Sequence, residues 1–421
     1  MTLPLAGIRV VEIASFVAVP AAGALLADLG AEVIKVEVPW GEIFRHSRPK
    51  LAGFENDFPA GPPFQMDNRG KRSLAIDLAL PQAREALSKV IARADIVLTN
   101  VLPERLSKYQ LDPERLRAEC PELIVGRVSG YGADGPRADD PAFDYTAFWA
   151  LSGLMDSMRD PAASPAWMRP GVGDHSAALA LVAGILAALR TRDAGGGGQV
   201  VDVTLQHVGY YINGNDTAYA LVTNELPPRH DRKAPRNPLW NHYPCRGEPC
   251  RGEPRRGKPC RGEPCQGDRW LFLVMIDSDR YWPALCRALD REALATDPRF
   301  VDAVGRFRNS RELVAILDGL FAERSLEAWG AAFSRERLIW APMRTLDEAI
   351  QDSNAEATGC FATVEHPQFG RFRTVAPPIK LSAHPMPGTA TAPLLSADTG
   401  AVLREVGVDE ETVALLVAVA S

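Results

Sequence analysis

One acidic residue, Asp174, stands where a carboxylate could act as a nucleophile. It follows the glycine-containing run 169–173 and precedes a long apolar stretch, 175–192, which we expect to form a largely buried helix. A carboxylate with an ordinary pKa is ionised at neutral pH and needs no base to activate it. Its attack on a thioester would form an acyl anhydride with the enzyme. The position equally suits a helix N-cap, so both roles stay open on local grounds. His175 is adjacent, but neighbouring side chains diverge on a helix, so we assign it no role.

Motifs of several common enzyme classes are missing from the chain. The turn 14–21 lacks the Gly-x-Gly-x-x-Gly pattern that lets a backbone approach a pyrophosphate. No Gly-x-x-x-x-Gly-Lys-Ser/Thr, His-Glu-x-x-His or Gly-x-Ser-x-Gly occurs, which argues against a P-loop NTPase, a zincin and an α/β-hydrolase. The glycine run 194–199 follows an expected helix and precedes an expected strand, so we interpret it as a turn rather than a phosphate cradle.

A pentapeptide repeat, CRGEP with variations, fills residues 245–264. It contains or adjoins four of the seven cysteines, namely Cys245, Cys250, Cys260 and Cys265. They could form a four-thiolate zinc site, or they could be copies of one cysteine in a tandem duplication. We favour the duplication and a solvated loop without metal, because a four-residue gap within each cysteine pair is not the usual zinc spacing. The three scattered cysteines suit free thiols in a reducing compartment.

The elements that position Asp174 and the other candidate residues are predicted by apolar runs that alternate with helical patterns. We expect strands at 8–13, 33–36, 74–78, 96–98, 123–128 and 200–203, and one of the intervening helices at 81–93. This alternation predicts an α/β fold with a Rossmann-like open, mostly parallel sheet covered on both faces. Ligands of such sheets lie beyond the carboxyl ends of the strands. Those ends supply Ser15, Phe16, Val17, Asn100, Val101, Ser129, Gly130 and Tyr131.

Composition changes divide the chain into segments. Residues 1–223 are expected to form the large Rossmann-like domain, and 224–268 a linker rich in Pro, Arg and Asn that contains the repeat. A smaller α+β domain should occupy 269–340, with a strand at 270–275 and helices at 310–322 and 325–333. Residues 341–421 should return to the large domain and end in a helix at 410–420.

The overall charge and hydropathy exclude several classes of partner. The chain of 421 residues is 46% hydrophobic and carries 47 basic and 53 acidic side chains, a net charge of −6. A surface of that sign does not favour nucleic acids. The longest early uncharged run, 13–27, contains Pro20 and Gly23 and is shorter than the roughly 20 residues that span a bilayer. We therefore expect a cytoplasmic protein with no membrane segment.

The sequence resembles the class III CoA-transferases, the CaiB/BaiF group that includes formyl-CoA transferase and carnitine CoA-transferase. The resemblance runs through nearly the whole chain, and no single piece of it is specific. In order, the matching segments are LAGIRVVE (5–12), ADLGAEVIKVE (27–37), NRGKRS (68–73), SGYGADGP (129–136), GD (173–174), GILAAL (184–189), GQVVDV (198–203), PIKLS (378–382) and APLL (392–395).

This resemblance implies a mechanism and an assembly. Two chains would form an interlocked homodimer. Asp174 matches the nucleophilic aspartate, which forms an aspartyl anhydride with the acyl group of an acyl-CoA and then an aspartyl-CoA thioester that a carboxylic acid turns over. CoA enters as a substrate, so no ATP, metal or permanently bound cofactor is required. The residues expected to bind CoA are Phe16, Val17, Ala18, Lys71, Arg72, Asn100, Val101, Lys108 and Gly130.

Departures from the family pattern limit what can be carried over. Val38 replaces an arginine, although Arg45 lies nearby, and Val17 replaces a glutamine that contacts oxalate in formyl-CoA transferase; the tetraglycine lid of that enzyme is not evident near 235–245. An α-methylacyl-CoA racemase of the same fold is the nearest alternative. Racemases use a His–Asp pair where this chain has Phe143-Asp144, and Phe cannot shuttle a proton, so we favour the transferase. A CoA-binding protein without turnover is the second alternative.

Overall fold

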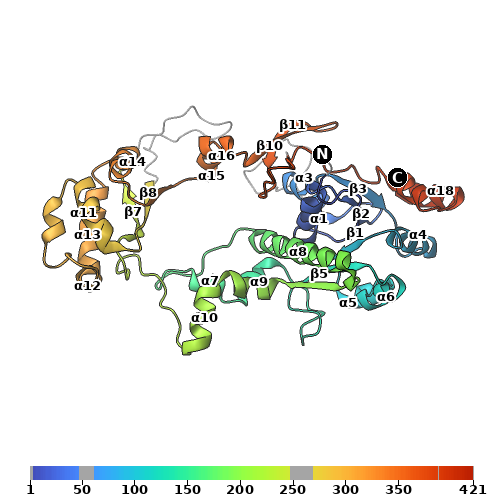
Figure 1. Cartoon of the computed structure of the whole chain (residues 1–421), viewed down its shortest axis with the longest axis horizontal. Helices are drawn as coiled ribbons and strands as arrows, with labels where there is room; N and C mark the ends of the chain where they lie inside the picture. The colour runs from blue at the N-terminus through green and yellow to red at the C-terminus, as the bar shows by residue number, and fades with distance from the viewer. Residues whose placement is uncertain (1–2, 47–60, 247–268, 387, 421) are drawn as a thin grey trace. The chain divides into compact units, whose positions relative to one another are not determined.

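The computed structural model describes residues 3–46, 61–246, 269–386 and 388–420. Its residues form two compact units (Figure 1), the first taken from 1–157, 165–227 and 353–421, and the second from 158–164 and 228–352. Most of the predicted repeat, from residue 247 on, lies outside the described residues together with Cys250, Cys260 and Cys265. Cys245, the first residue of the repeat, is buried at the end of a strand and not in a solvated loop. The interpretation of the rest as a loop without metal stays a prediction.

A parallel six-stranded sheet forms the centre of the first unit. Its order is β3-β2-β1-β4-β5-β6, and every neighbouring pair is parallel. Successive residues belong to different cores: Val10 packs into the cluster on one face and Val11 into the cluster on the other. The predicted α/β sheet is confirmed. Its strands are β1 (Arg9–Ile13), β2 (Glu32–Glu37), β3 (Lys71–Ala75), β4 (Ile96–Thr99), β5 (Ile124–Ser129) and β6 (Val200–Thr204).

Two apolar helices cover one face of this sheet. They are α1 (Ala18–Asp28) and α8 (Val172–Thr191), which pack against each other and lie together in Figure 1. On α8, Leu181 and Ile185 are fully buried. Length and composition alone would allow the stretch from Val172 to Gly196 to cross a membrane. Its buried side chains instead pack into the same core as α1 and the sheet.

The expectation that α8 is largely buried is wrong for one of its faces. Leu179 and Leu186 are 44% and 38% exposed on the single chain. They belong to an apolar run that continues around the helix, whereas the sheet and α1 cover only part of its circumference.

The other face of the sheet is covered from both ends of the sequence. The helices there are α4 (Pro81–Ile91), α5 (Pro103–Lys108), α6 (Pro113–Glu119), α17 (Thr399–Glu405) and α18 (Glu410–Val419). The last two come from the C-terminal segment, which also reaches the edge strand β3. There the backbone N–H groups of Ser73 and Ala75 donate to the Asp398 carboxylate and the Thr399 hydroxyl, each at 2.9 Å. These bonds satisfy donors that an edge strand would leave unpaired.

Shorter elements complete the first unit. The helical ones are α2 (Ile43–His46), α3 (Pro62–Asp67), the π-helix η1 (Tyr145–Ala150), α7 (Leu154–Ser157), the π-helix η2 (Arg192–Gly196), α9 (Leu205–Ile212), α10 (Gly214–Thr223) and α16 (Ser353–Ala357). An antiparallel hairpin joins β10 (Phe361–His366) to β11 (Gly370–Val375). Of these elements, η1 and α9 matter most for the site, because they contact each other and α8.

The second unit is a small α+β structure. Its antiparallel sheet has the order β7-β8-β9, formed by β7 (Trp240–Cys245), β8 (Arg269–Val274) and β9 (Trp340–Met343). Leucine and aromatic side chains form most of its core, where Trp329 stacks on Phe333 with ring centroids 5.8 Å apart. The helices of this unit are α11 (Ser278–Ala288), the 3₁₀-helix η3 (Glu292–Thr296), α12 (Ala303–Arg308), α13 (Ser310–Phe321), α14 (Leu326–Arg335) and α15 (Leu346–Ala349). The strand and two helices predicted here are confirmed within two residues.

Candidate active site

Helix α8 begins earlier than the sequence suggested, which changes the position of Asp174. The residue before the helix is Gly171, whose φ of 80° lies in the left-handed region that favours glycine. Asp174 is therefore the third residue of the helix, and no side-chain cap bond forms at this end. The interpretation of Asp174 as an N-cap is wrong. Its carboxylate is left free for another role, in the first turn, where the helix dipole favours negative charge.

A close approach at Gly173 brings a second carboxylate to the same place. A Cβ atom on Gly173 would lie 2.6 Å from Cγ of Phe148 and 2.8 Å from Cβ of Asp144, so only glycine lets η1 and its preceding residue pack this closely on α8. The Gly173 N–H donates a 3.2 Å hydrogen bond to the Asp144 carboxylate. Asp144 is 2% exposed. Two acidic side chains that are 30 positions apart in the sequence thus share one end of α8.

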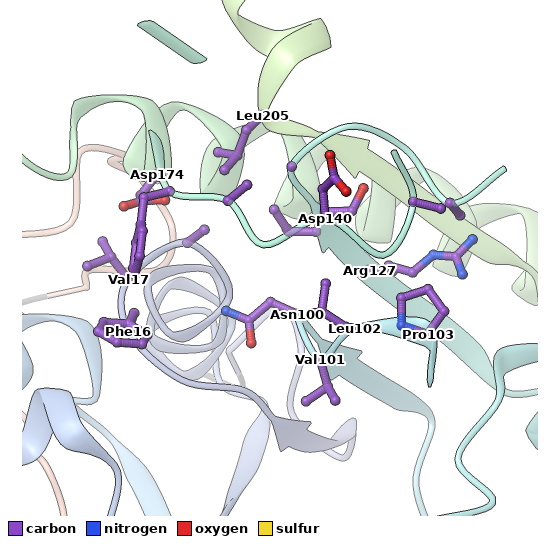
Figure 2. A pocket seen from close by; sticks show the side chains of 18 residues that line it. Phe16, Val17, Asn100, Val101, Leu102, Pro103, Arg127, Asp140, Asp174 and Leu205 are labelled. Atoms are coloured by element: carbon purple, nitrogen blue, oxygen red, sulfur yellow. The ribbon is translucent and has the colours of Figure 1, made fainter. Parts of the chain in front are cut away.

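Asp174 lines a cavity at the carboxyl ends of the strands. The cavity holds about 730 Å³, counting the space that is open to solvent. Figure 2 shows Asp174 at one side with Phe16 and Val17, and Arg127 at the opposite side. The site residues predicted from the sequence that line it are Phe16, Val17, Ala18, Asn100, Val101, Gly130 and Asp174.

The surroundings of Asp174 raise its pKa to about 7. Burial is the largest cause, because it disfavours the charged form, and the nearby charges of Asp144 and Asp67 act in the same direction. The charge of His175 acts against them. The expectation that Asp174 is simply ionised at neutral pH is therefore corrected: near pH 7 it is divided between the acid and the carboxylate.

His175 and Asp174 point into different spaces. The Nε2 atom of His175 lies 3.1 Å from a carboxylate oxygen of the buried Asp67, and this partner raises the pKa of the imidazole. His175 lines a second, apolar cavity with α1 and α3, which does not include Asp174. The side chains of Asp174 and His175 therefore diverge, as expected for neighbouring residues on a helix. His175 contributes a positive charge near Asp174 when protonated, rather than a direct contact in the first cavity.

Asn100 has a structural task in addition to facing the cavity. Its side chain pairs with both backbone groups of Ser15: it accepts from the N–H at 3.1 Å and donates to the C=O at 2.7 Å. This pairing ties the end of β4 to the turn between β1 and α1. Directly after the neighbouring strand β5, a Cβ on Gly130 would lie 2.2 Å from that of Ala142, so glycine is needed at this wall of the cavity.

Three of the predicted CoA-binding cations lie elsewhere. Lys71 is buried, with Nζ 2.7 Å from the carboxylate of Glu12, and Arg72 pairs with the carboxylates of Glu32 and Glu405. Both stand at the start of β3, whereas the cavity lies beyond the carboxyl ends of the strands. Lys108 is exposed at the end of α5, with Nζ 5.6 Å from the centre of the Tyr109 ring. Lys71 and Arg72 are therefore left out of the site proposed below.

The sequence analysis did not select several residues that line the cavities. Arg127, Asp140 and Leu205 belong to the cavity of Asp174, and Arg105 lines an adjacent one that also includes Glu37 and Tyr109. Arg127 could have been found from the sequence, because it lies two residues before the end of β5. Leu205 could have been found in the same way, because it comes directly after β6. Asp140 lies in a loop whose path is set by packing rather than by periodicity.

Comparison with known proteins decides the family. The model of CoA-transferase family III matches residues 5–250 and 255–399. The chain belongs to CoA-transferase family III. A (R)-2-hydroxy-4-methylpentanoate CoA-transferase of Clostridioides difficile is 30% identical over 97% of both chains. A formyl-CoA:oxalate CoA-transferase of Streptomyces avermitilis is 28% identical over 99% of this chain and 98% of its own length.

Solved structures agree with this membership of family III. A CAIB/BAIF family protein from Brucella suis superposes on this chain with a TM-score of 0.80 and is 26% identical to it. The superposition covers 96% of this chain and 100% of the Brucella protein. The CoA-transferase predicted from the sequence is thereby confirmed at the level of the family. CoA thioesters and carboxylates are the substrates that define such enzymes, and Asp174 is one of the residues that line the cavity beyond the strand ends.

Proposed function

We propose that this family III member is an acyl-CoA:carboxylate CoA-transferase that works through covalent intermediates on Asp174. The observation that carries the proposal is the position of Asp174: it is the third residue of α8, it lines the cavity beyond the strand ends, and its pKa is raised to about 7. A carboxylate with a raised pKa is a stronger nucleophile than an ordinary aspartate once it is ionised.

The reaction consists of balanced exchanges at carbonyl carbons. The Asp174 carboxylate attacks the thioester carbonyl, the C–S bond breaks, and an aspartyl anhydride and CoA thiolate result. The thiolate then attacks the aspartyl carbonyl of the anhydride, releasing the first acid and leaving an aspartyl-CoA thioester. The acceptor carboxylate repeats the two steps in reverse and leaves with CoA. No proton, ATP or redox equivalent is consumed, in keeping with a reaction without a permanently bound cofactor.

The electrostatics around Asp174 support the first step. The ionised form is disfavoured by burial and by Asp144. Acylation converts this carboxylate into a neutral anhydride and so removes the unfavourable interaction with Asp144. Asp144 itself stays bound to the Gly173 N–H, which keeps it beside α8 throughout the reaction.

The adjacent cavity is suited to the nucleotide part of CoA. It opens beside the ends of β1 and β2, shares Val101 with the cavity of Asp174, and contains the guanidinium-bearing Arg105. Lys108 is one helical turn further along α5, so both cations project from the same side of that helix. We place the phosphates of CoA near Arg105 and Lys108, and the pantetheine arm along Val101 and Asn100 towards Asp174.

We further propose a homodimer, interlocked as the family resemblance implies, in the cytoplasm. Its support is an apolar surface on α9 and α10, made by Tyr211, Ile212, Leu221 and Val222, which are 81%, 56%, 81% and 86% exposed on the single chain. An apolar patch of this kind is typical of an interface. With the exposed face of α8, it gives the chain a large area to bury against a second copy.

An α-methylacyl-CoA racemase is the alternative function within the same fold, and the presence of Phe143 argues against it. Phe143 lines the cavity with Asp174, where a racemase would need a proton-shuttling group. A protein that binds CoA without turnover is the other alternative.

Trapping of the intermediate separates these three functions. The protein is incubated with an acyl-CoA and then with neutral hydroxylamine, and the peptide that contains Asp174 is analysed by mass spectrometry. A hydroxamate at Asp174 that is absent without acyl-CoA supports the transferase. Loss of the α-proton to deuterated solvent with no hydroxamate would establish the racemase. Binding of CoA with neither product would leave only the protein without turnover.

A further inference from the structure

Phe16 holds an unusual backbone conformation at the wall of the cavity. Its φ is 65°, in the left-handed region that a bulky side chain adopts only when its surroundings enforce it. Its ring contacts Phe143 edge to face, with centroids 5.4 Å apart and an interplanar angle of 88°. The centre of its ring also lies 6.3 Å from that of Phe44 in α2. Of these three aromatic residues, Phe16 and Phe143 line the cavity with Asp174.

A buried carboxylate enforces this conformation. Glu42 is 5% exposed, and its Oε2 accepts the backbone N–H of Phe16 at 2.6 Å. Its other oxygen, Oε1, lies 2.7 Å from Nζ of Lys35, which is fully buried. A charge-assisted hydrogen bond to a backbone N–H is stronger than a neutral one, and here the ammonium of Lys35 fixes the carboxylate that makes it.

Lys35 is itself held from two further directions. Its ammonium donates to Oε1 of Glu12 at 3.0 Å and to the backbone C=O of Ala14 at 3.2 Å. The bond from Lys35 to Ala14 and the pairing of Asn100 with Ser15 fix Ala14 and Ser15, the two residues before Phe16. The turn between β1 and α1 is thus fixed at three consecutive residues, and Phe16 has little freedom to move away from a bound substrate.

We propose that Phe16 is the specificity-determining side chain of this site, held by Glu42 as a positioning residue, and that it selects acyl groups with an apolar side chain. The proposal rests on the proposed transferase function and deepens it. Phe143, 57% exposed, completes an apolar contact surface with Phe16. Branched aliphatic and aromatic monocarboxylic acids fit such a surface, because contact with a ring buries their side chains.

The charges near Asp174 favour the same class of acid. Asp144 and Asp67 are buried carboxylates that already raise the pKa of Asp174. Neither of them lines the cavity of Asp174, but a second substrate carboxylate close to Asp174 would add to the same like-charge repulsion in a partly desolvated site. Monocarboxylic acids with apolar side chains therefore gain apolar contact with Phe16 and avoid this repulsion. Short dicarboxylic acids make little apolar contact and are repelled.

Substitution of Phe16 tests the selectivity directly. CoA transfer is measured with 4-methylpentanoate, 3-phenylpropanoate, propanoate and succinate as acceptors. In Phe16→Ala, kcat/KM for 3-phenylpropanoate relative to propanoate should fall about tenfold or more, the size expected for lost apolar contacts. Phe307→Ala, at a side chain 52% exposed in the second unit, is the matched control and should keep the parental ratio. An unchanged ratio in Phe16→Ala, or a parental preference for succinate, would overturn the proposal.

Substitution of Glu42 tests the positioning role. Glu42→Gln keeps an oxygen that can accept the Phe16 N–H but removes the charge that pairs with Lys35, so the acceptor ratio should shift in the direction of Phe16→Ala. In a Phe16→Gly background, where φ is unconstrained and no ring is present, Glu42→Gln should leave the ratio unchanged. Asp28→Asn breaks another largely buried ion pair, to Arg69, with no contact to Phe16, and should not alter the ratio. Equal shifts in Asp28→Asn and Glu42→Gln, or a shift that persists without the ring, would refute positioning through Phe16.

Trapping with hydroxylamine tests the proposed transferase function separately from the proposed role of Phe16 in selectivity. The parental protein should give a hydroxamate at Asp174 with propanoyl-CoA. Absence of the hydroxamate in the parental protein removes the transferase function itself. Its presence with an unchanged acceptor ratio removes only the role of Phe16. Should Glu42→Gln not fold, Glu42→Asp, which shortens the side chain by one carbon, replaces it in the same comparison.

Discussion

The Asp144 carboxylate accepts the backbone N–H of Gly173, one residue before Asp174. This hydrogen bond places a buried negative charge beside the proposed nucleophile. Burial of Asp174 is the larger cause of its raised pKa, and the charge of Asp144 acts in the same direction.

The rate should depend on pH through Asp174. Its pKa is about 7, and only the ionised form attacks a thioester. We expect kcat/KM to rise with pH to a plateau above neutrality and to be about 100-fold lower at pH 5, two pH units below that pKa. Asp144→Asn should move the midpoint to lower pH. Initial rates between pH 5 and 9 check both statements, and a flat profile over this range would contradict the raised pKa.

The stability of the protein should depend on the same group with a definite sign. An unfolded aspartate has a pKa near the ordinary 3.8, whereas folded Asp174 titrates near 7. The folded state therefore binds more protons between these values, and its stability falls as pH rises from 4 to 7. Asp174→Asn removes this loss. The variant should equal the parent at pH 4 and be about 1–2 kcal/mol more stable at pH 8, a value discounted for partial solvent exposure. Denaturant unfolding of both proteins at pH 4 and pH 8 measures this difference in the free energy of unfolding. Equal stability of the variant and the parent at pH 8 would contradict the prediction.

Replacement of Gly173 should damage both packing and activity. A Cβ there would meet Phe148 and Asp144 at under 3 Å, in contacts of 2.6 and 2.8 Å. Gly173→Ala should lose about 1–3 kcal/mol of stability through overpacking, and most transferase activity through displacement of Asp174. Gly319→Ala on α13 is the matched control, because nothing lies within 4 Å of its added Cβ, and it should be neutral or slightly stabilising. Similar unfolding midpoints for the two variants would show that the close approach does not matter.

The assembly should depend on the apolar surface of α9 and α10. Leu221→Glu together with Val222→Glu should lower the mass observed by analytical ultracentrifugation from a dimer to a monomer, or prevent soluble expression. Leu415→Glu on α18, where the side chain is 43% exposed, is the control and should leave the mass unchanged. If the dimer is interlocked, two differently tagged forms mixed after purification should not exchange subunits. A monomeric parental protein would contradict the proposal, and rapid exchange would contradict interlocking alone.

The sequence by itself determined the sheet and the position of the acidic group at the start of α8. Alternation of apolar runs and helical patterns located five of the six parallel strands closely, because each strand must bury side chains on both faces, as Val10 and Val11 do. The strand expected at 74–78 is instead β3 at Lys71–Ala75, so its bounds were three residues too late. The sequence could not reveal that Lys71, expected near the nucleotide, is buried beside Glu12, because charge in a sequence gives no sign of burial. Nor could it place Asp144 beside Asp174 or give Asp174 a pKa near 7. Solvation and neighbouring charge arise from contacts between distant segments, so only the tertiary structure decided them.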